Sequence, residues 1–336
     1  DLGGDDAADA GGDDAPDVGG DVAPDAGDGD EPGPLFQPSA PIYETYAQHL
    51  LSLGGTSSVQ DRFKATATNG ARKTAFLSDP TAILDAPVWA RIQGERGALV
   101  PSASTTNAAQ EMQQAQIAAG VNFDLGAYAN GNVIGGVNLS YGQSSTDVTS
   151  QFGNGSIKTD SFGIGVSATW FGKSGLYVDG QLKFDLHESD LTSDILGQLV
   201  SNNRGQGTTA SVEVGQMIEV APNLRFTPQA QLSHTQIKFD SFTGPNDERV
   251  SLTEGKNTQL RLGMVAEYAL NSGGGSDALY GVVNLHKSLD SLSNVDVSGV
   301  ALSQVVDTWE AEIGLGGSYA INDQTRILGD VTYRAD

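Results

Sequence analysis

Apolar and polar residues alternate with a period of two through most of this chain, from Asp85 to its end. The stretch 161–171, SFGIGVSATWF, changes residue by residue between a bulky or apolar side chain and Ser, Gly or Thr. Successive side chains of a β-strand point to opposite faces, so each such stretch predicts a strand with one apolar face. Eleven segments of this kind follow one another, each about 9–12 residues long.

Strands of that length, tilted by about 45°, are long enough to cross a bilayer, whereas strands of soluble proteins are more often about 5–6 residues long. The links alternate between short ones (YANGN, FGKSG, APN, AINDQ) and longer polar ones such as QSSTDVTSQFGNGSIKTD. Short turns on one side and long loops on the other are typical of outer-membrane barrels, which also carry aromatic girdles. Aromatic residues stand at the strand ends: Tyr128, Tyr141, Trp170, Phe171, Tyr268, Tyr319 and Tyr333.

The pattern therefore predicts an all-β fold, a transmembrane antiparallel up-and-down β-barrel over residues 85–336. A large soluble all-β protein is the alternative. Single-chain bacterial barrels have an even number of strands. We therefore expect twelve strands in the complete protein, with about eleven in this chain and the last one beyond Asp336.

Residues 1–40 have a different composition. Residues 1–34 contain eleven Asp and Glu31 but no Lys, Arg or aromatic residue, and so supply −12 of the formal net charge of −24. Such a segment buries too little apolar surface to fold, so we expect a disordered acidic linker. The acidic balance makes nucleic acid an unfavourable partner. The chain has no cysteine, which excludes disulfides and thiolate chemistry.

Residues 41–84 lead into the barrel. Apolar residues at helical spacing predict a short helix over Tyr43–Leu53, ended by Gly54 and Gly55. Its apolar positions are Tyr43, Tyr46, Ala47, Leu50 and Leu51. We interpret residues 56–84 as irregular. A helix about 10–12 Å across fits a lumen of intermediate width. We therefore expect it inside the barrel, where it closes the pore, and expect deletion of residues 41–55 to raise single-channel conductance.

The polar face of the predicted strands is unusually charged. Charged residues near the middle of a bilayer destabilise a barrel when they face lipid, so these positions are expected to line the lumen. They are Arg91, Glu95, Asp124, Asp179, Lys183, Asp185, Glu213, Arg225, Arg261, Glu267, Glu310, Glu312, Asp330 and Arg334. They indicate a hydrated path or a surface on which the helix docks.

Candidate chemistry is sparse. Asp185 and His187 stand two apart on one strand face and could form a base–orienter pair, although every lumen-facing strand presents polar residues at that spacing. The four histidines show no metal-ligand spacing. The sequence thus predicts no catalytic, cofactor-binding or metal site.

From Leu35 onward the chain resembles the C-terminal translocator unit of an autotransporter of the type Va secretion pathway. LFQPSAPIYETYAQHLLSLG is similar to that family's segment before the barrel, and VWARIQGERG to its first strand. GNVIGGVNLSYG and SFGIGVSATWF are similar to its glycine-rich strands, and WEAEIGLGGSYAINDQTRILGDVTYR to its closing strands. The family's chains end in an aromatic residue, whereas this one ends in TYRAD.

The resemblance implies a twelve-stranded barrel with a helix through the pore, located in the bacterial outer membrane. It also implies a function, which is to export and anchor an N-terminal passenger that these residues do not include. Outer-membrane lipids, the passenger and the barrel-assembly machinery are the expected partners, and a monomeric barrel is the expected state. A general diffusion porin and a barrel-embedded hydrolase that uses Asp185 and His187 are the alternatives.

Overall fold

The computed structural model describes residues 35–63, 88–270, 277–320 and 326–335. The expected disordered linker lies almost entirely outside these residues, as does most of the approach to the first strand.

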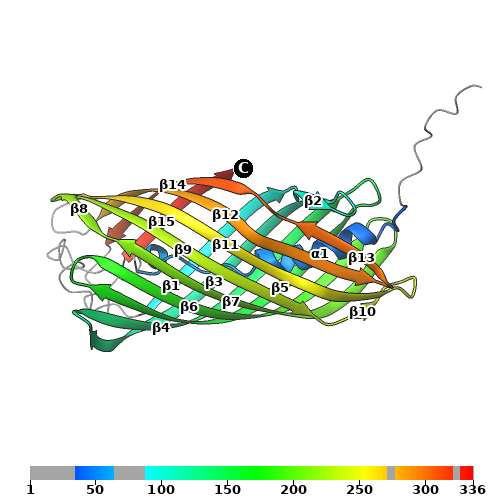
Figure 1. The fold of residues 1–336 in the computed structure, drawn as a ribbon, viewed down its shortest axis with the longest axis horizontal. Coiled ribbons are helices and arrows are strands. Elements are labelled where there is room, and N and C mark those ends of the chain that lie inside the picture. Colours follow the sequence, from blue (N-terminus) through cyan, green and yellow to red (C-terminus); the bar gives the residue numbers. More distant parts are fainter. Residues whose placement is uncertain (1–34, 64–87, 271–276, 321–325, 336) are drawn as a thin grey trace, which may run out of the picture. The chain divides into compact units, whose positions relative to one another are not determined.

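Long antiparallel strands form the wall of a barrel that surrounds a helical segment (Figure 1). The long strands are β1 (Val88–Leu99), β3 (Ala109–Tyr128), β4 (Gly131–Thr149), β5 (Gly155–Gly172), β6 (Leu176–Ser193), β7 (Gly197–Gln216), β9 (Leu224–Phe239), β11 (Arg249–Ala269), β12 (Ala278–Val297), β14 (Trp309–Ala320) and β15 (Arg326–Ala335). Short strands extend the hairpins: β2 (Ala103–Ser104), β8 (Ile218–Ala221), β10 (Phe242–Thr243) and β13 (Val300–Val305). The predicted antiparallel barrel with eleven long strands is confirmed.

Neighbouring strands in the sheet are neighbours in sequence, as in an up-and-down barrel. Within the described part of the chain β1 pairs with β3 and β15 pairs with β14, and β2 pairs with β13 at the end that carries the long hairpins. A twelfth strand between β15 and β1 remains a prediction.

The strands are longer than the sequence pattern indicated. Strand β3 has 20 residues and β11 has 21. The stretches interpreted as long loops are mostly extended hairpins; in QSSTDVTSQFGNGSIKTD the strands continue to Thr149 and resume at Gly155. Beyond the bilayer the outward positions are polar too, so the apolar signal stops although the backbone ladder continues.

An apolar band surrounds the outer face of the barrel. At the edge of this band nearest the long hairpins, four exposed side chains lie opposite one another on adjacent strands: Ile117, Tyr141, Phe162 and Leu186. Two positions further along, the outward residues are polar: Gln143, Asp160, Glu188 and Arg204. The band is the surface that a lipid bilayer covers. Phe171, predicted as part of an aromatic girdle, faces the lumen instead and is 1% exposed, because it alternates with Trp170 on the strand and packs against Phe63 and Tyr177.

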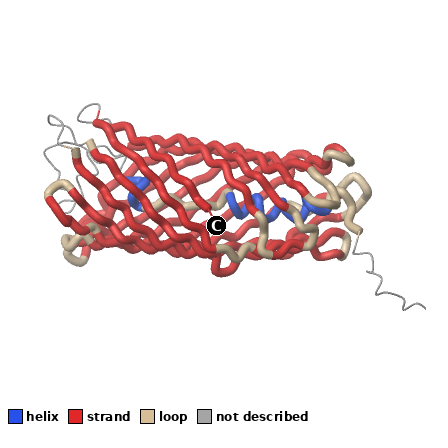
Figure 2. Tube along the Cα trace, turned by 90° about the horizontal axis from the view of Figure 1, so that it is seen from above, coloured by secondary structure: helices blue, strands red, loops and turns tan. Residues whose placement is uncertain are grey.

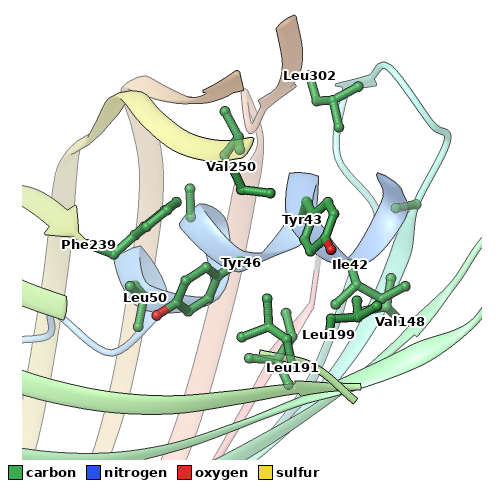
Figure 3. Close-up of a cluster of buried hydrophobic side chains, with 14 of the residues drawn as sticks. Ile42, Tyr43, Tyr46, Leu50, Val148, Leu191, Leu199, Phe239, Val250 and Leu302 are labelled. Atoms are coloured by element: carbon green, nitrogen blue, oxygen red, sulfur yellow. The ribbon is translucent and has the colours of Figure 1, made fainter. Parts of the chain in front are cut away.

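Helix α1 (Ala40–Ser52) lies inside the barrel, near the long-hairpin end (Figures 1 and 2). It begins earlier than predicted because Pro41 fits the first turn of a helix, and it ends at Ser52. The N–H of the capping residue Leu53 donates to the carbonyl of Leu50. Its apolar residues pack against side chains from many strands, as Figure 3 shows for Tyr43, Tyr46 and Leu50.

A second helix, α2 (Val59–Phe63), occupies part of the stretch interpreted as irregular. It has only five residues and forms against the lumen wall, which explains why its own sequence carries no helical pattern. Neither described helix is long and apolar enough to span a membrane.

The packing around α1 predicts that Leu191→Ala destabilises the barrel. Leu191 is fully buried against α1, and truncation of such a residue costs about 2–5 kcal/mol. Leu186→Ala is the matched control, since Leu186 lies on the same strand but faces outward and is 48% exposed. Denaturant titration in detergent micelles measures both. If the two variants lose equal unfolding free energy, the contact between α1 and the wall contributes little to stability.

Candidate functional site in the lumen

Helix α1 occupies the part of the barrel that extends beyond the apolar band. Its residues contact inward positions such as Thr159, whose outward neighbours are Lys158 and Asp160, and Asn203, whose outward neighbours are Asn202 and Arg204. The plug formed by α1 therefore lies above the bilayer, at the long-hairpin end, and not at the level of the membrane.

Glu44 fixes α1 to the turn between β2 and β3. Its carboxylate accepts hydrogen bonds from the Thr105 N–H at 2.7 Å, the Thr106 N–H at 2.9 Å, the Ser104 hydroxyl at 2.9 Å and the Thr106 hydroxyl. Burial raises the pKa of the Glu44 carboxyl, and these four hydrogen bonds oppose the rise. A buried carboxylate with this many donors is a strong positional constraint on the helix.

His49 joins α1 to strands β4 and β5. Its Nδ1 lies 2.7 Å from the Thr146 hydroxyl and its Nε2 lies 2.9 Å from the Thr159 hydroxyl. Complete burial lowers the pKa of His49 to about 3, so the ring is neutral at physiological pH and makes one donor and one acceptor bond. Tyr43 and Tyr46 donate to Glu248 and Asn203 at 2.7 and 2.9 Å.

The chain then continues through the lumen at the level of the apolar band. The Gly54 carbonyl accepts the Thr209 and Thr235 hydroxyls at 2.9 and 3.0 Å, and the Ser57 carbonyl accepts Gln181 at 2.7 Å. In α2 the Val59 N–H reaches the Glu213 carboxylate at 3.3 Å.

One network of hydrogen bonds crosses half of the inner wall. Arg261 donates to Glu213 at 2.9 Å and to Asn284 at 3.4 Å. Asn284 donates to Glu312 at 2.5 Å, and Arg334 donates to Glu312 at 2.8 Å. The network links β7, β11, β12, β14 and β15, and pairs each of its carboxylates with an arginine.

The remaining charged positions predicted from sequence alternate with the outward residues of their strands and so lie on the inner face. Only some of them form ion pairs with one another. Lys183 pairs with Asp185 at 3.0 Å, Arg225 with Glu267 at 3.7 Å, and Glu310 with Arg334 at 3.5 Å. Two others are exposed: Glu95 accepts from Gln114 on β3, and Asp124 accepts the Gly126 N–H beside a turn. Arg91 donates to Ser57, and Asp330 accepts the Tyr280 hydroxyl at 3.5 Å.

The structure does not unite Asp185 and His187. Asp185 pairs with Lys183, while His187 shares a 2.8 Å hydrogen bond with Ser161 through its Nδ1. Within the described part of the chain, neither Asp185 Oδ2 nor His187 Nε2 has a hydrogen-bond partner. No carboxylate orients this histidine, so the arrangement is not that of a base–orienter pair.

Sequence reasoning missed the residues of the N-terminal segment that hold it in place: Glu44, His49 and Arg62. Glu44 and His49 lie on the polar face of α1, which an amphipathic pattern assigns to solvent. Inside a barrel, however, both faces of a helix are buried. A helix predicted to lie in the lumen therefore indicates that its polar residues bind the wall.

An apolar outer band, a polar lumen and a pore occupied by the chain's own N-terminal segment define an outer-membrane β-barrel with a filled pore. The sequence agrees: residues 88–332 match the family described as "Autotransporter beta-domain". The chain belongs to this family and is an outer-membrane translocator unit.

Its relatives are much longer proteins. The chain is 35% identical over 299 residues to the "Adhesin BmaC autotransporter" of Brucella suis, which covers 86% of this chain and 9% of the adhesin. It is 27% identical over 186 residues to the "Pertactin autotransporter" of Bordetella bronchiseptica, which covers 54% of this chain and 20% of pertactin. The chain thus spans a fifth or less of these relatives.

Solved structures show the same fold. The transport unit of AIDA-I from Escherichia coli aligns with a TM-score of 0.70 at 17% identity, over 90% of this chain and 94% of the other. The translocator domain of NalP from Neisseria meningitidis aligns with a TM-score of 0.59 at 14% identity, over 89% and 94%.

The inner network predicts that Arg261→Met is strongly destabilising. The Arg261 and Glu213 side chains are 10% and 0% exposed, and breaking a buried ion pair costs about 3–5 kcal/mol because one charge stays uncompensated. Arg261→Met combined with Glu213→Gln is expected to cost less than the sum of the two single changes. A double-mutant cycle by denaturant titration measures this coupling.

Arg96→Met is the control for that cycle. Arg96 lies 3.7 Å from Glu111, but both side chains are largely exposed, so the change should cost no more than about 1 kcal/mol. If the double variant loses as much unfolding free energy as the two single variants together, Arg261 and Glu213 are not coupled.

Proposed function

We propose that this chain exports and anchors a passenger that precedes Asp1, and that residues 36–63 are the tail of that passenger, held in the pore after export. The observation that carries the proposal is the direction of this segment. Its first residues lie at the long-hairpin end, where the Phe36 and Phe152 rings are 5.1 Å apart and Asn246 donates to Gln37 at 3.1 Å.

Its last described residues lie at the opposite end. Phe63 packs against Phe171, beside the short turn between β5 and β6. Short turns face the periplasm in outer-membrane barrels, and long loops face outward. A segment that runs from the outer end at Phe36 to the periplasmic end at Phe63, ahead of β1, supports export of a passenger that is N-terminal to it.

The alternatives fit the lumen less well. A diffusion porin needs a continuous aqueous channel, whereas here α1 is buried from Ala40 to Leu51 and the following segment is bonded to the wall. A barrel-embedded hydrolase needs an oriented base, and His187 has no orienting carboxylate among the described residues. We therefore propose a non-enzymatic role.

The partners follow from the same proposal. The apolar band is a surface for outer-membrane lipids, and insertion of such a barrel requires the general barrel-assembly machinery of the membrane. Because the chain's own segment fills its pore, a single barrel is sufficient for closure, and we propose a monomer.

The proposal predicts that a reporter domain fused before Asp1 is displayed on the surface of intact Gram-negative cells. External protease should remove the reporter and antibody should bind it without permeabilisation. The control is the same reporter fused to residues 1–63 alone, which should stay protected. A folded barrel whose reporter remains protected in intact cells would contradict the export function.

A further inference from the structure

We propose that the lumen contains a second closing site, separate from α1: a pocket on the inner wall that binds an arginine followed by an aromatic residue. Arg62 and Phe63 of the chain itself occupy it. The inference goes beyond the export function, since it concerns what closes the pore at the level of the membrane, whichever passenger is exported.

The first part of the pocket is a carboxylate. Asp179 on β6 has a completely buried side chain and forms an ion pair with Arg62, whose side chain is 4% exposed. The Thr169 hydroxyl and the Gln181 amide also donate to this carboxylate, at 2.5 and 2.8 Å. These wall residues hold the carboxylate in place, so the site is formed by the barrel and only its cation comes from the N-terminal segment.

The second part is an aromatic pocket. Phe63 is 4% exposed and meets Phe171 edge to face, with ring centroids 5.2 Å apart. Tyr177, Ile134 and Met217 belong to the same buried cluster. The Arg62 guanidinium lies 5.1 Å from the centroid of the Phe63 ring, so the cation and the ring are recognised as one unit.

Charge explains why the site selects arginine. The neighbouring Glu213 is already paired with Arg261, and Asp185 with Lys183. Asp179 forms its ion pair with Arg62, so removing Arg62 leaves one buried negative charge in a wall of balanced pairs. The Arg62 guanidinium reaches this carboxylate through Nη2 and lies beside the Phe63 ring, a contact with an aromatic ring that favours arginine over lysine.

The position of the pocket separates it from α1. Asp179 and Glu213 lie between the outward residues Val178 and Gly180, and Val212 and Val214, within the apolar band. The contacts of α1 lie beyond that band, at the level of Thr159 and Asn203. The sequence suggested that α1 alone closes the pore, whereas this arrangement predicts two closures in series.

Single-channel conductance of the full chain in planar bilayers tests the proposal. Deletion of residues 40–52 alone, or Arg62→Ala with Phe63→Ala alone, should leave conductance close to that of the parent chain, because the other closure remains. The two changes together should raise it several-fold. Full opening on deletion of residues 40–52 alone, or a closed pore in the combined variant, would overturn the second site.

Two further variants and a folding assay distinguish loss of the pocket from misfolding of the barrel. Asp179→Asn in the chain lacking residues 40–52 changes the charge without changing the shape, and should also open the pore. Arg96→Ala in the same background removes an outward arginine and should not. Heat-modifiable migration on gels confirms that each barrel is folded.

A peptide tests the recognition directly. The octapeptide TSSVQDRF, residues 56–63, added from the short-turn side to the open combined variant, should block its conductance in a dose-dependent manner. The same peptide with alanine in place of the arginine should not block. Equal block by both peptides would show that the pocket does not recognise the arginine.

Discussion

A polar side chain that strand alternation directs into the lumen costs free energy unless it forms a hydrogen bond, and this constraint organises the interior of the barrel. The inner wall is polar, and many of its donors and acceptors are satisfied in one of two ways. Some pair across the wall, as Glu213 does with Arg261, and others pair with the N-terminal segment, as Thr159 does with His49. The segment thus completes the interior of the barrel as well as filling it.

The sequence predicted the strands well within the apolar band that contacts lipid, and poorly beyond it. Within the apolar band the period of two is strict, so strands such as β5 and β6 were identified from their outward residues. Beyond Phe162 and Leu186 the outward side becomes polar, and hairpins that continue as strand were interpreted as loops. Which lumen residues meet could not be predicted, because that depends on register and on a segment about 100 residues away, as with Arg62 and Asp179.

The two ends of the N-terminal segment are held by different chemistry. Helix α1 is fixed by neutral donors and acceptors and by two carboxylates: Glu44 binds backbone N–H groups, and Glu248 accepts the Tyr43 hydroxyl. Residues 59–63 are fixed by an ion pair and a ring pocket.

The lumen is also uneven from side to side. The network of arginines and carboxylates lies on β7 to β15, against one side of residues 54–63. The other side, towards β3, β4 and β5, includes short residues such as Ala118, Ser140 and Gly165, which line a small cavity of about 40 Å³. One side of the lumen therefore holds the segment through the Glu213 carboxylate, and the other leaves a small space beside it.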